Sequence, residues 1–275
     1  MPKIHPSAIV HPEAELADDV EVGAYAVVEA DVTIGPGCVL RHHAVVRRFT
    51  SLSCGNLVDS FAVLGGEPQD LKFDPKTRSF LRIGDGNVFR EGVTISRATG
   101  EGNATVVGDR TYWMTAAHAG HNAVVGDECI LVNGAALAGH TVIGRRVVIS
   151  AHVGVHQFCW VGDGVMSQGH SAIAMHVPPF TLVAGVDRVV GLNIVGLRRW
   201  PGLGEEGRRE VKEAFSLVYR AKLPLREALA RMDEHREWGT AAGSFREFVR
   251  RVLDAKPPYL RGLTPQRRRA RPESD

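Results

Sequence analysis

The chain has 275 residues, 23% of them charged and 44% hydrophobic, which is the composition of an ordinary globular protein. It contains no run of about 18 apolar residues, so we expect no transmembrane helix and no stable membrane insertion. The first residues, Met1 to Pro6, lack the apolar stretch of a signal peptide. The four cysteines show no C-x-x-C spacing, which favours reduced thiols and a cytoplasmic location.

The net charge of +2 conceals an asymmetry along the chain. Residues 1–200 hold 16 Lys and Arg against 19 Asp and Glu, whereas residues 201–275 hold 17 against 12. A basic C-terminal part suggests an acidic partner, although solvated helix faces would produce the same excess.

An apolar residue returns at every sixth place over most of the first 200 residues, with a small residue two places before it. In the central stretch the sixth-place residues are Val107, Trp113, Ala119, Val125, Leu131, Leu137, Ile143, Ile149, Val155, Val161, Ser167 and Ile173, of which Ser167 is the polar exception. A period of six fits neither an α-helix nor an alternating strand and is typical of a parallel β-helix built from hexapeptides. Three hexapeptides make one triangular coil of about 18 residues, and coils stack about 4.8 Å apart.

The repeat predicts a β-helix over residues 1–195 with one break, a loop excursion at residues 65–82. Glycine, proline and charged residues fill that excursion, and a long loop on a regular scaffold often carries function. A smaller departure from Thr99 to Asn103 keeps the phase of the repeat.

A helical period follows and predicts a small α-helical domain over residues 196–262. We expect helices around Val211–Tyr219, from Leu225 to about Glu234, and from Ser244 to Leu253. The polar, arginine-rich residues 263–275 are expected to form a disordered tail. The helices can cover the open end of the β-helix, and a triangular prism favours a closed homotrimer.

Polar residues interrupt the repeat at one edge of the predicted prism. One full coil after His121 comes Gly139, beside His140, and one coil further comes Gln157, beside His156; His118 shares the coil of His121. Such a cluster can bind a metal ion or can provide a general base together with substrate-binding groups. No carboxylate or cysteine completes a ligand set, so we expect no metal; exposed turn histidines without chemistry are the remaining alternative.

The chain resembles the UDP-N-acetylglucosamine acyltransferases that begin lipid A synthesis. The resemblance spans roughly residues 4 to 255, and its motifs are PQDLKF at 68–73, AHAGH at 117–121, NGAALAGH at 133–140, VHQF at 155–158, MHVPP at 175–179 and NIVGLRR at 193–199. It implies an all-β left-handed parallel β-helix followed by the small α-helical domain. It also implies transfer of a 3-hydroxyacyl chain from acyl carrier protein to the 3-hydroxyl of the UDP-sugar.

The resemblance also implies roles for individual residues. His121 matches the general base, and a backbone N–H near Gly139 would meet the oxyanion. The expected substrate-binding residues are Gln69, Asp70, Lys72, His118, His140, His156, Gln157, Asn193 and Arg199, of which the first three match a loop that reaches a neighbouring subunit's site. No cofactor is implied beyond the phosphopantetheine of the acyl donor. The implied partners are acyl carrier protein, the UDP-sugar and two further copies of the chain, without nucleic acid.

The chain departs from the family pattern at several positions. Asn122 follows the expected base where the family usually has aspartate, and Val195 and Trp200 replace an acidic and a basic residue. His152 and His170 stand near the expected acyl groove. Two alternatives therefore stay open: a sister enzyme that acylates a 3-amino UDP-sugar, and a non-catalytic paralogue that still binds the carrier protein.

Overall fold

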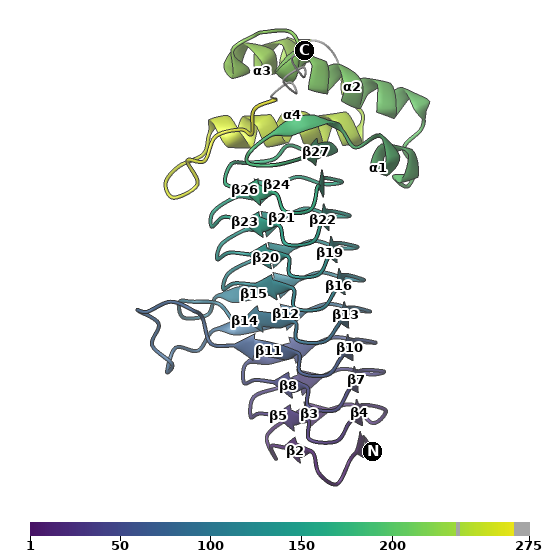
Figure 1. Cartoon of the computed structure of the whole chain (residues 1–275), viewed down its shortest axis with the longest axis vertical. Helices are drawn as coiled ribbons and strands as arrows, with labels where there is room; N and C mark the ends of the chain where they lie inside the picture. The colour runs from purple at the N-terminus through teal and green to yellow at the C-terminus, as the bar shows by residue number, and fades with distance from the viewer. Residues whose placement is uncertain (235–236, 267–275) are drawn as a thin grey trace, which may run out of the picture.

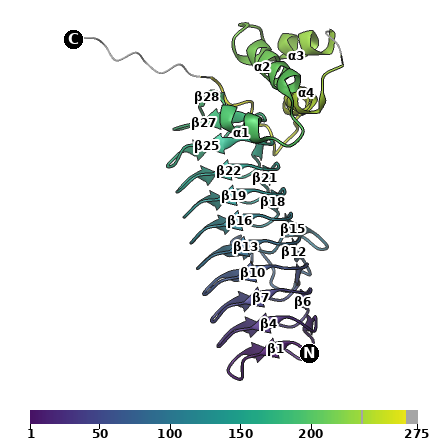
Figure 2. The same cartoon turned by 90° about the vertical axis from the view of Figure 1, so that its right-hand side faces the viewer.

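A computed structural model describes residues 1–234 and 237–266, and they form a long prism of stacked coils with helices at one end (Figures 1 and 2). Within these residues, 28 strands form three sheets. The strands pair in parallel and each sheet takes every third strand of the chain, except at the C-terminal end of the first sheet, where Thr181–Val183 follows out of this order and Val189–Leu192 pairs antiparallel with it. The N-terminus lies at the uncovered end of the prism. The predicted left-handed parallel β-helix is confirmed.

The strands are mostly two residues long. The first sheet contains β1 (Lys3–Ile4), β4 (Glu21–Val22), β7 (Val39–Leu40), β10 (Leu57–Val58), β13 (Val88–Phe89), β16 (Tyr112–Trp113), β19 (Ile130–Leu131), β22 (Val148–Ile149), β25 (Met166–Ser167), β27 (Thr181–Val183) and β28 (Val189–Leu192). The second sheet contains β2 (Ile9–Val10), β5 (Val27–Val28), β8 (Val45–Val46), β11 (Val63–Gly66), β14 (Thr94–Ser96), β17 (His118–Ala119), β20 (Ala136–Leu137), β23 (Gly154–Val155) and β26 (Ala172–Ile173). The third sheet contains β3 (Glu15–Leu16), β6 (Thr33–Ile34), β9 (Thr50–Leu52), β12 (Phe80–Ile83), β15 (Ala104–Val107), β18 (Val124–Val125), β21 (Val142–Ile143) and β24 (Trp160–Val161).

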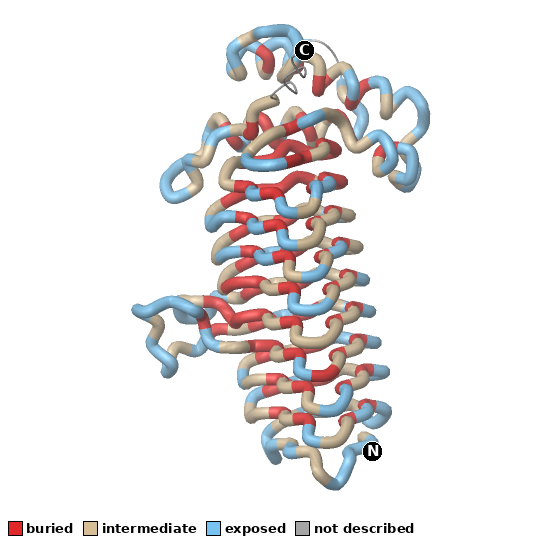
Figure 3. Tube along the Cα trace, viewed as in Figure 1, coloured by how far each residue is buried: buried red, intermediate tan, exposed pale blue. Residues whose placement is uncertain are grey.

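The core of the prism is the column of sixth-place residues that the repeat predicts. Along most of the column these side chains are buried, and Figure 3 shows the buried positions recurring on the coils that follow the first one. Ser167, the polar exception, is also fully buried, and its hydroxyl accepts a hydrogen bond from the Ser150 N–H. Ile4 stays 43% exposed because no coil covers it at the open end.

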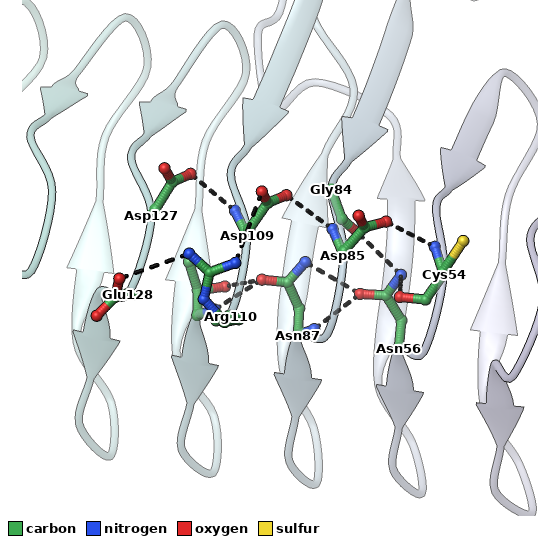
Figure 4. A network of polar contacts seen from close by, with 10 residues as sticks. Cys54, Asn56, Gly84, Asp85, Asn87, Asp109, Arg110, Asp127 and Glu128 are labelled. Atoms are coloured by element: carbon green, nitrogen blue, oxygen red, sulfur yellow. Dashed lines mark hydrogen bonds and ion pairs between the residues drawn. The ribbon is translucent and has the colours of Figure 1, made fainter.

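Two coils are longer than the others without disturbing the strand stack. Leu57 pairs with Val88 and Val88 pairs with Tyr112, although in both cases the chain between the partners is longer than a regular coil. Figure 4 shows the polar ladder that joins these unequal coils at the corner between the third and first sheets. There the carboxylates of Asp85, Asp109 and Asp127 each accept a backbone N–H from the preceding coil. A second row inside the corner runs from Asn56 through Asn87 to Thr111 and satisfies these buried polar groups.

The loop excursion is shorter than the predicted residues 65–82. Strand β11 continues to Gly66, which pairs with Ser96, and β12 begins at Phe80 and pairs on both sides. The residues outside the strands are therefore 67–79. The two glycines, Gly65 and Gly66, suggested a loop in the sequence. In the structure they allow β11 to bend while it stays paired with β14, as in a β-bulge.

In the described part of the chain, four helices cover the C-terminal end of the prism: α1 (Ile194–Arg199), α2 (Glu205–Tyr219), α3 (Leu225–Glu234) and α4 (Thr240–Leu253) (Figure 1). The last three occupy the segments with helical periodicity, and α2 and α4 begin earlier than expected. The sequence did not indicate α1, which begins two residues before the expected domain boundary. Its N-cap is Asn193, whose side chain accepts from the Gly196 N–H.

The expected disordered tail begins too early at residue 263. Thr264 is fully buried, its hydroxyl donates to the His176 carbonyl, and its own carbonyl accepts from the Tyr219 hydroxyl. Residues 263–266 therefore join the end of the β-helix to α2. Residues 267–275 lie outside the described residues. Within the described part of the chain, no helix has the length and apolarity needed to cross a membrane.

Candidate active site

A groove of about 590 Å³ runs along the outer face of the second sheet. Its lining includes six residues that the sequence singled out: Gln69, His118, His121, Gly139, His156 and Gln157. The predicted stacking of successive coils is confirmed, because the His140 N–H donates to the His121 carbonyl and His118 pairs with Ala136 on the next coil. The structure thus brings most of the predicted polar residues to one place.

The floor of the groove consists of small residues that the sequence analysis did not connect with the site. Ala136, Gly154 and Ala172 are the outward-facing residues of β20, β23 and β26 and lie above one another on three coils. Because their side chains are so small, the sheet surface is hollowed there. The signal was present in the sequence as a small residue at the same outward position of each successive coil.

The ring orientation of His121 is set by Asn122. The Oδ1 of Asn122 accepts hydrogen bonds from the backbone N–H of Thr99 at 2.9 Å and from its hydroxyl at 2.8 Å, and the Nδ2 donates to the Thr99 carbonyl at 3.2 Å. The amide is therefore placed with its oxygen 2.8 Å from the His121 Nδ1. An amide oxygen can only accept, so Nδ1 carries the proton and Nε2 is left as the basic nitrogen.

Gly139 lies against the ring of His121. A Cβ on Gly139 would be 2.7 Å from the Cε1 and 2.8 Å from the Nε2 of His121, so a side chain there would displace the ring. The Gly139 N–H donates to no backbone carbonyl among the described residues. Gly139 also lines the groove beside His121, which is compatible with the oxyanion hypothesis.

His118 and His140 flank His121 in different ways. The Nδ1 of His118 is 2.8 Å from the Thr94 hydroxyl, and burial lowers the pKa of His118 below its usual value. His140 stands edge-on to His121 at 5.2 Å and stacks on Phe158 at 4.9 Å. Burial, and next the neighbouring His121, lower the pKa of His140. Both rings therefore remain neutral at neutral pH, and His140 supports His121 from outside the groove lining.

The loop at residues 67–79 brings only one of its three predicted residues to the groove. Gln69 lines the groove of its own chain, beside His118 and His121. Asp70 and Lys72 are exposed and outside the lining, and the Asp70 carboxylate accepts from the Lys72 N–H in a local turn.

Asn193 and Arg199 lie apart from the groove. The Asn193 side chain is engaged at both ends, because Oδ1 caps α1 and Nδ2 donates to the Gly164 carbonyl at 3.0 Å. Arg199 is exposed at the end of α1. Within one chain, neither residue contributes to the groove lining.

The acidic and soft ligands that a metal site needs are not gathered here. Within residues 1–234 and 237–266, no group of three or more His, Cys, Asp and Glu side chains could hold a metal ion.

Comparison with known proteins agrees with this geometry. Residues 176–263 match the second domain of UDP N-acetylglucosamine O-acyltransferase, and residues 13–48 match the bacterial transferase hexapeptide repeat. The acyl-[acyl-carrier-protein]–UDP-N-acetylglucosamine O-acyltransferase of Stenotrophomonas maltophilia is 38% identical over 94% of this chain and 98% of its own length. The enzyme of the same name from Gloeothece citriformis is 44% identical over 69% of this chain and 68% of its own length.

Among solved structures, the UDP-N-acetylglucosamine O-acyltransferase of Moraxella catarrhalis superposes with a TM-score of 0.87 at 34% identity. The match covers 95% of this chain and 99% of that one. Sequence and fold thus agree over nearly the whole length, and the chain belongs to the UDP-N-acetylglucosamine O-acyltransferase family.

Proposed function

We propose that this chain transfers a 3-hydroxyacyl group from acyl carrier protein to the 3-hydroxyl of UDP-N-acetylglucosamine, the first step of lipid A biosynthesis. The observation that carries the proposal is the pair formed by His121 and Asn122. The amide oxygen of Asn122 holds the proton on Nδ1 and leaves Nε2 of His121 free in a groove of about 590 Å³.

The reaction follows from this arrangement. Nε2 of His121 removes the proton of the sugar 3-hydroxyl while its oxygen attacks the thioester carbonyl. The tetrahedral oxyanion accepts a hydrogen bond from the Gly139 N–H. Collapse of this intermediate breaks the carbon–sulfur bond, and the phosphopantetheine thiolate takes the proton back from the His121 imidazolium. Atoms and charge balance without any cofactor of the protein itself.

The remaining residues are assigned to substrate binding. Gln69, His118, His156 and Gln157 line the groove and hold the sugar nucleotide. Asp70, Lys72, Asn193 and Arg199 lie outside it, and we propose that they act in a homotrimer, where the surface of one chain faces the groove of the next. The basic C-terminal residues suit an acidic carrier protein. The four unpaired cysteines are compatible with a reducing cytoplasm.

The proposal is tested by mass spectrometry of the products formed by the purified full-length protein. The reaction mixture contains carrier proteins bearing 3-hydroxyacyl chains of several lengths, together with UDP-N-acetylglucosamine and its 3-amino analogue. An O-acylated product that disappears in His121→Ala supports the proposal. His11→Ala is the matched control, because this exposed histidine lies on the first coil and does not line the groove. An amide product alone would indicate the 3-amino acceptor, and carrier binding without any product would indicate the non-catalytic paralogue.

A further inference from the structure

The segment from Ser96 to Asn103 joins the two parts of the site that come from different coils. On one side, Thr99 holds Asn122 through the three hydrogen bonds described above, and Asn122 holds His121. On the other side, the segment contacts both ends of the loop at residues 67–79, which carries Gln69 into the groove. The position of this loop relative to His121 therefore depends on how firmly the segment holds it.

Arg97 makes most of the side-chain contacts with the loop. Its Nη1 donates to the Thr77 carbonyl at 2.6 Å and contacts the Ser79 hydroxyl at 3.3 Å, and its Nη2 donates to the Pro75 carbonyl at 3.1 Å. The planar guanidinium suits three acceptors on one returning strand of chain. These contacts fix the second half of the loop, residues 75–79.

Arg97 is also buried to an unusual degree for an arginine. It is 1% exposed, and its guanidinium carbon lies 5.3 Å from the ring centre of Phe49 and 4.9 Å from that of Phe73. Phe73 belongs to the loop, so the loop itself covers the charge. Moving the loop away would expose Phe73 further and break the hydrogen bonds and the cation–π contact of the guanidinium, so the position seen here is the favoured one.

The backbone of the same segment holds the first half of the loop. The Arg97 N–H donates to the Gly66 carbonyl at 2.8 Å, and the Ser96 hydroxyl donates to the Glu67 carbonyl at 3.4 Å. Gln69 follows two residues later. One arginine thus fixes the loop at both limbs, by its backbone on the outgoing side and by its side chain on the returning side.

We propose that Arg97 is a positioning residue that holds the loop at residues 67–79 so that Gln69 reaches the groove beside His121. The kinetic part of this inference rests on the proposed acyltransferase function; the structural part, that Arg97 holds the loop, does not. Arg97 touches neither the groove nor the reacting atoms, so its effect on the reaction passes through Gln69.

The structural part is tested by hydrogen–deuterium exchange of the full-length protein. Arg97→Met removes all three side-chain contacts, and exchange in residues 67–79 should rise at least tenfold while exchange in β4, β7 and β10 stays unchanged. Arg97→Lys should give an intermediate effect, because one ammonium group cannot reach all three acceptors. Phe73→Ala removes only the aromatic cover and serves if the arginine variants do not fold. Unchanged loop exchange in folded variants would overturn the proposal.

The kinetic part is tested by a double-mutant cycle between Arg97→Met and Gln69→Ala. We expect each variant to raise the KM for the UDP-sugar roughly tenfold with little change in kcat, because a misplaced binding group weakens acceptor binding. The double variant should be no worse than the more impaired single variant, because both changes remove the same contact. Arg82→Met is the matched control, since Arg82 is an exposed arginine of the neighbouring β12. Additive effects would show that Arg97 does not act through Gln69.

The two failures are distinguishable. If the protein catalyses no acyl transfer, the proposed function fails while the exchange experiment still decides whether Arg97 holds the loop. If transfer occurs but the cycle is additive, the function stands and the positioning role of Arg97 fails.

Discussion

Asn122→Asp is the most informative single change, because it alters the charge beside His121 and little else. Asn122 has a φ of 59°, in the left-handed region that asparagine and aspartate both tolerate, so the backbone can stay as it is. The Thr99 N–H and hydroxyl would still donate to the carboxylate and keep it ionised. The Nδ2 contact with the Thr99 carbonyl is lost, which costs about 1–2 kcal/mol of stability.

The expected size of the effect follows from the contact distance. The acceptor oxygen lies 2.8 Å from the His121 Nδ1, which puts the two charges about 4 Å apart, centre to centre. At an effective dielectric constant of about 20, their attraction is about 4 kcal/mol, and screening by the open groove reduces it to about 1.5–3 kcal/mol. One pH unit corresponds to about 1.4 kcal/mol. An attraction of about 1.5–3 kcal/mol would therefore move the protonation of the base by about 1–2 pH units in the variant.

The assay is the pH dependence of kcat/KM. The acid limb of the Asn122→Asp profile should lie about 1–2 pH units higher than that of the unaltered chain, because more base is protonated at a given pH. Asn103→Asp is the control: it adds the same charge next to Thr99, but Asn103 contacts only the Thr99 carbonyl and not the ring. Equal shifts in both variants, or no shift in Asn122→Asp, would refute the assignment of His121 as the base held by Asn122.

Three further predictions concern the groove, the polar ladder and the joint with the helices. Gly139→Ala should lower kcat at least about 100-fold by displacing the His121 ring, whereas Gly191→Ala, which adds a methyl group into open space, should leave kcat unchanged; similar kcat values in the two variants would contradict this. Asn87→Ala leaves buried donors and acceptors unpaired, so urea denaturation should show a loss of about 2–4 kcal/mol, and a loss below about 1 kcal/mol would argue against the ladder. Burial lowers the pKa of His176, so the unfolded chain binds a proton that the folded chain does not, and the free energy of unfolding should fall as the pH drops below about 6.5. The fall should be smaller in His176→Asn, and equal falls would exclude this histidine as a source.

Much of the fold could be predicted from the sequence because the apolar residues that recur at every sixth place indicate which side chains face inward. The column from Val107 to Ile173 needed no knowledge of tertiary contacts, since each coil repeats the one below it. The clustering of His118, His121, His156 and Gln157 followed from the same repeat, because a fixed coil length converts sequence distance into position.

What could not be predicted depends on segments that leave the repeat. The contact between Thr99 and Asn122 joins two coils across a departure whose path the period does not specify. Helix α1 was not predicted because six residues are too few to show a helical period. The sequence alone also does not distinguish an asparagine that caps a helix, as Asn193 does, from one that contacts a nucleotide. The packing of Thr264 was not predicted because a polar composition indicates only that a segment favours contact with water. It does not indicate which hydrogen-bond partners, such as the His176 carbonyl, the folded chain brings close to that segment.

The stacked coils of the prism also determine where the molecule should come apart first. Each coil contacts mainly its two neighbours, so stability is a sum of local steps and loss of structure begins at an uncovered end. The first coil has such an end, with Ile4 43% exposed and Val10 and Leu16 only partly buried, whereas the opposite end is held under the helices. The groove lies several coils from the fraying end and next to the covered one. The groove is thus placed in the part of the prism that opens last, and the N-terminal coils can loosen without disturbing it.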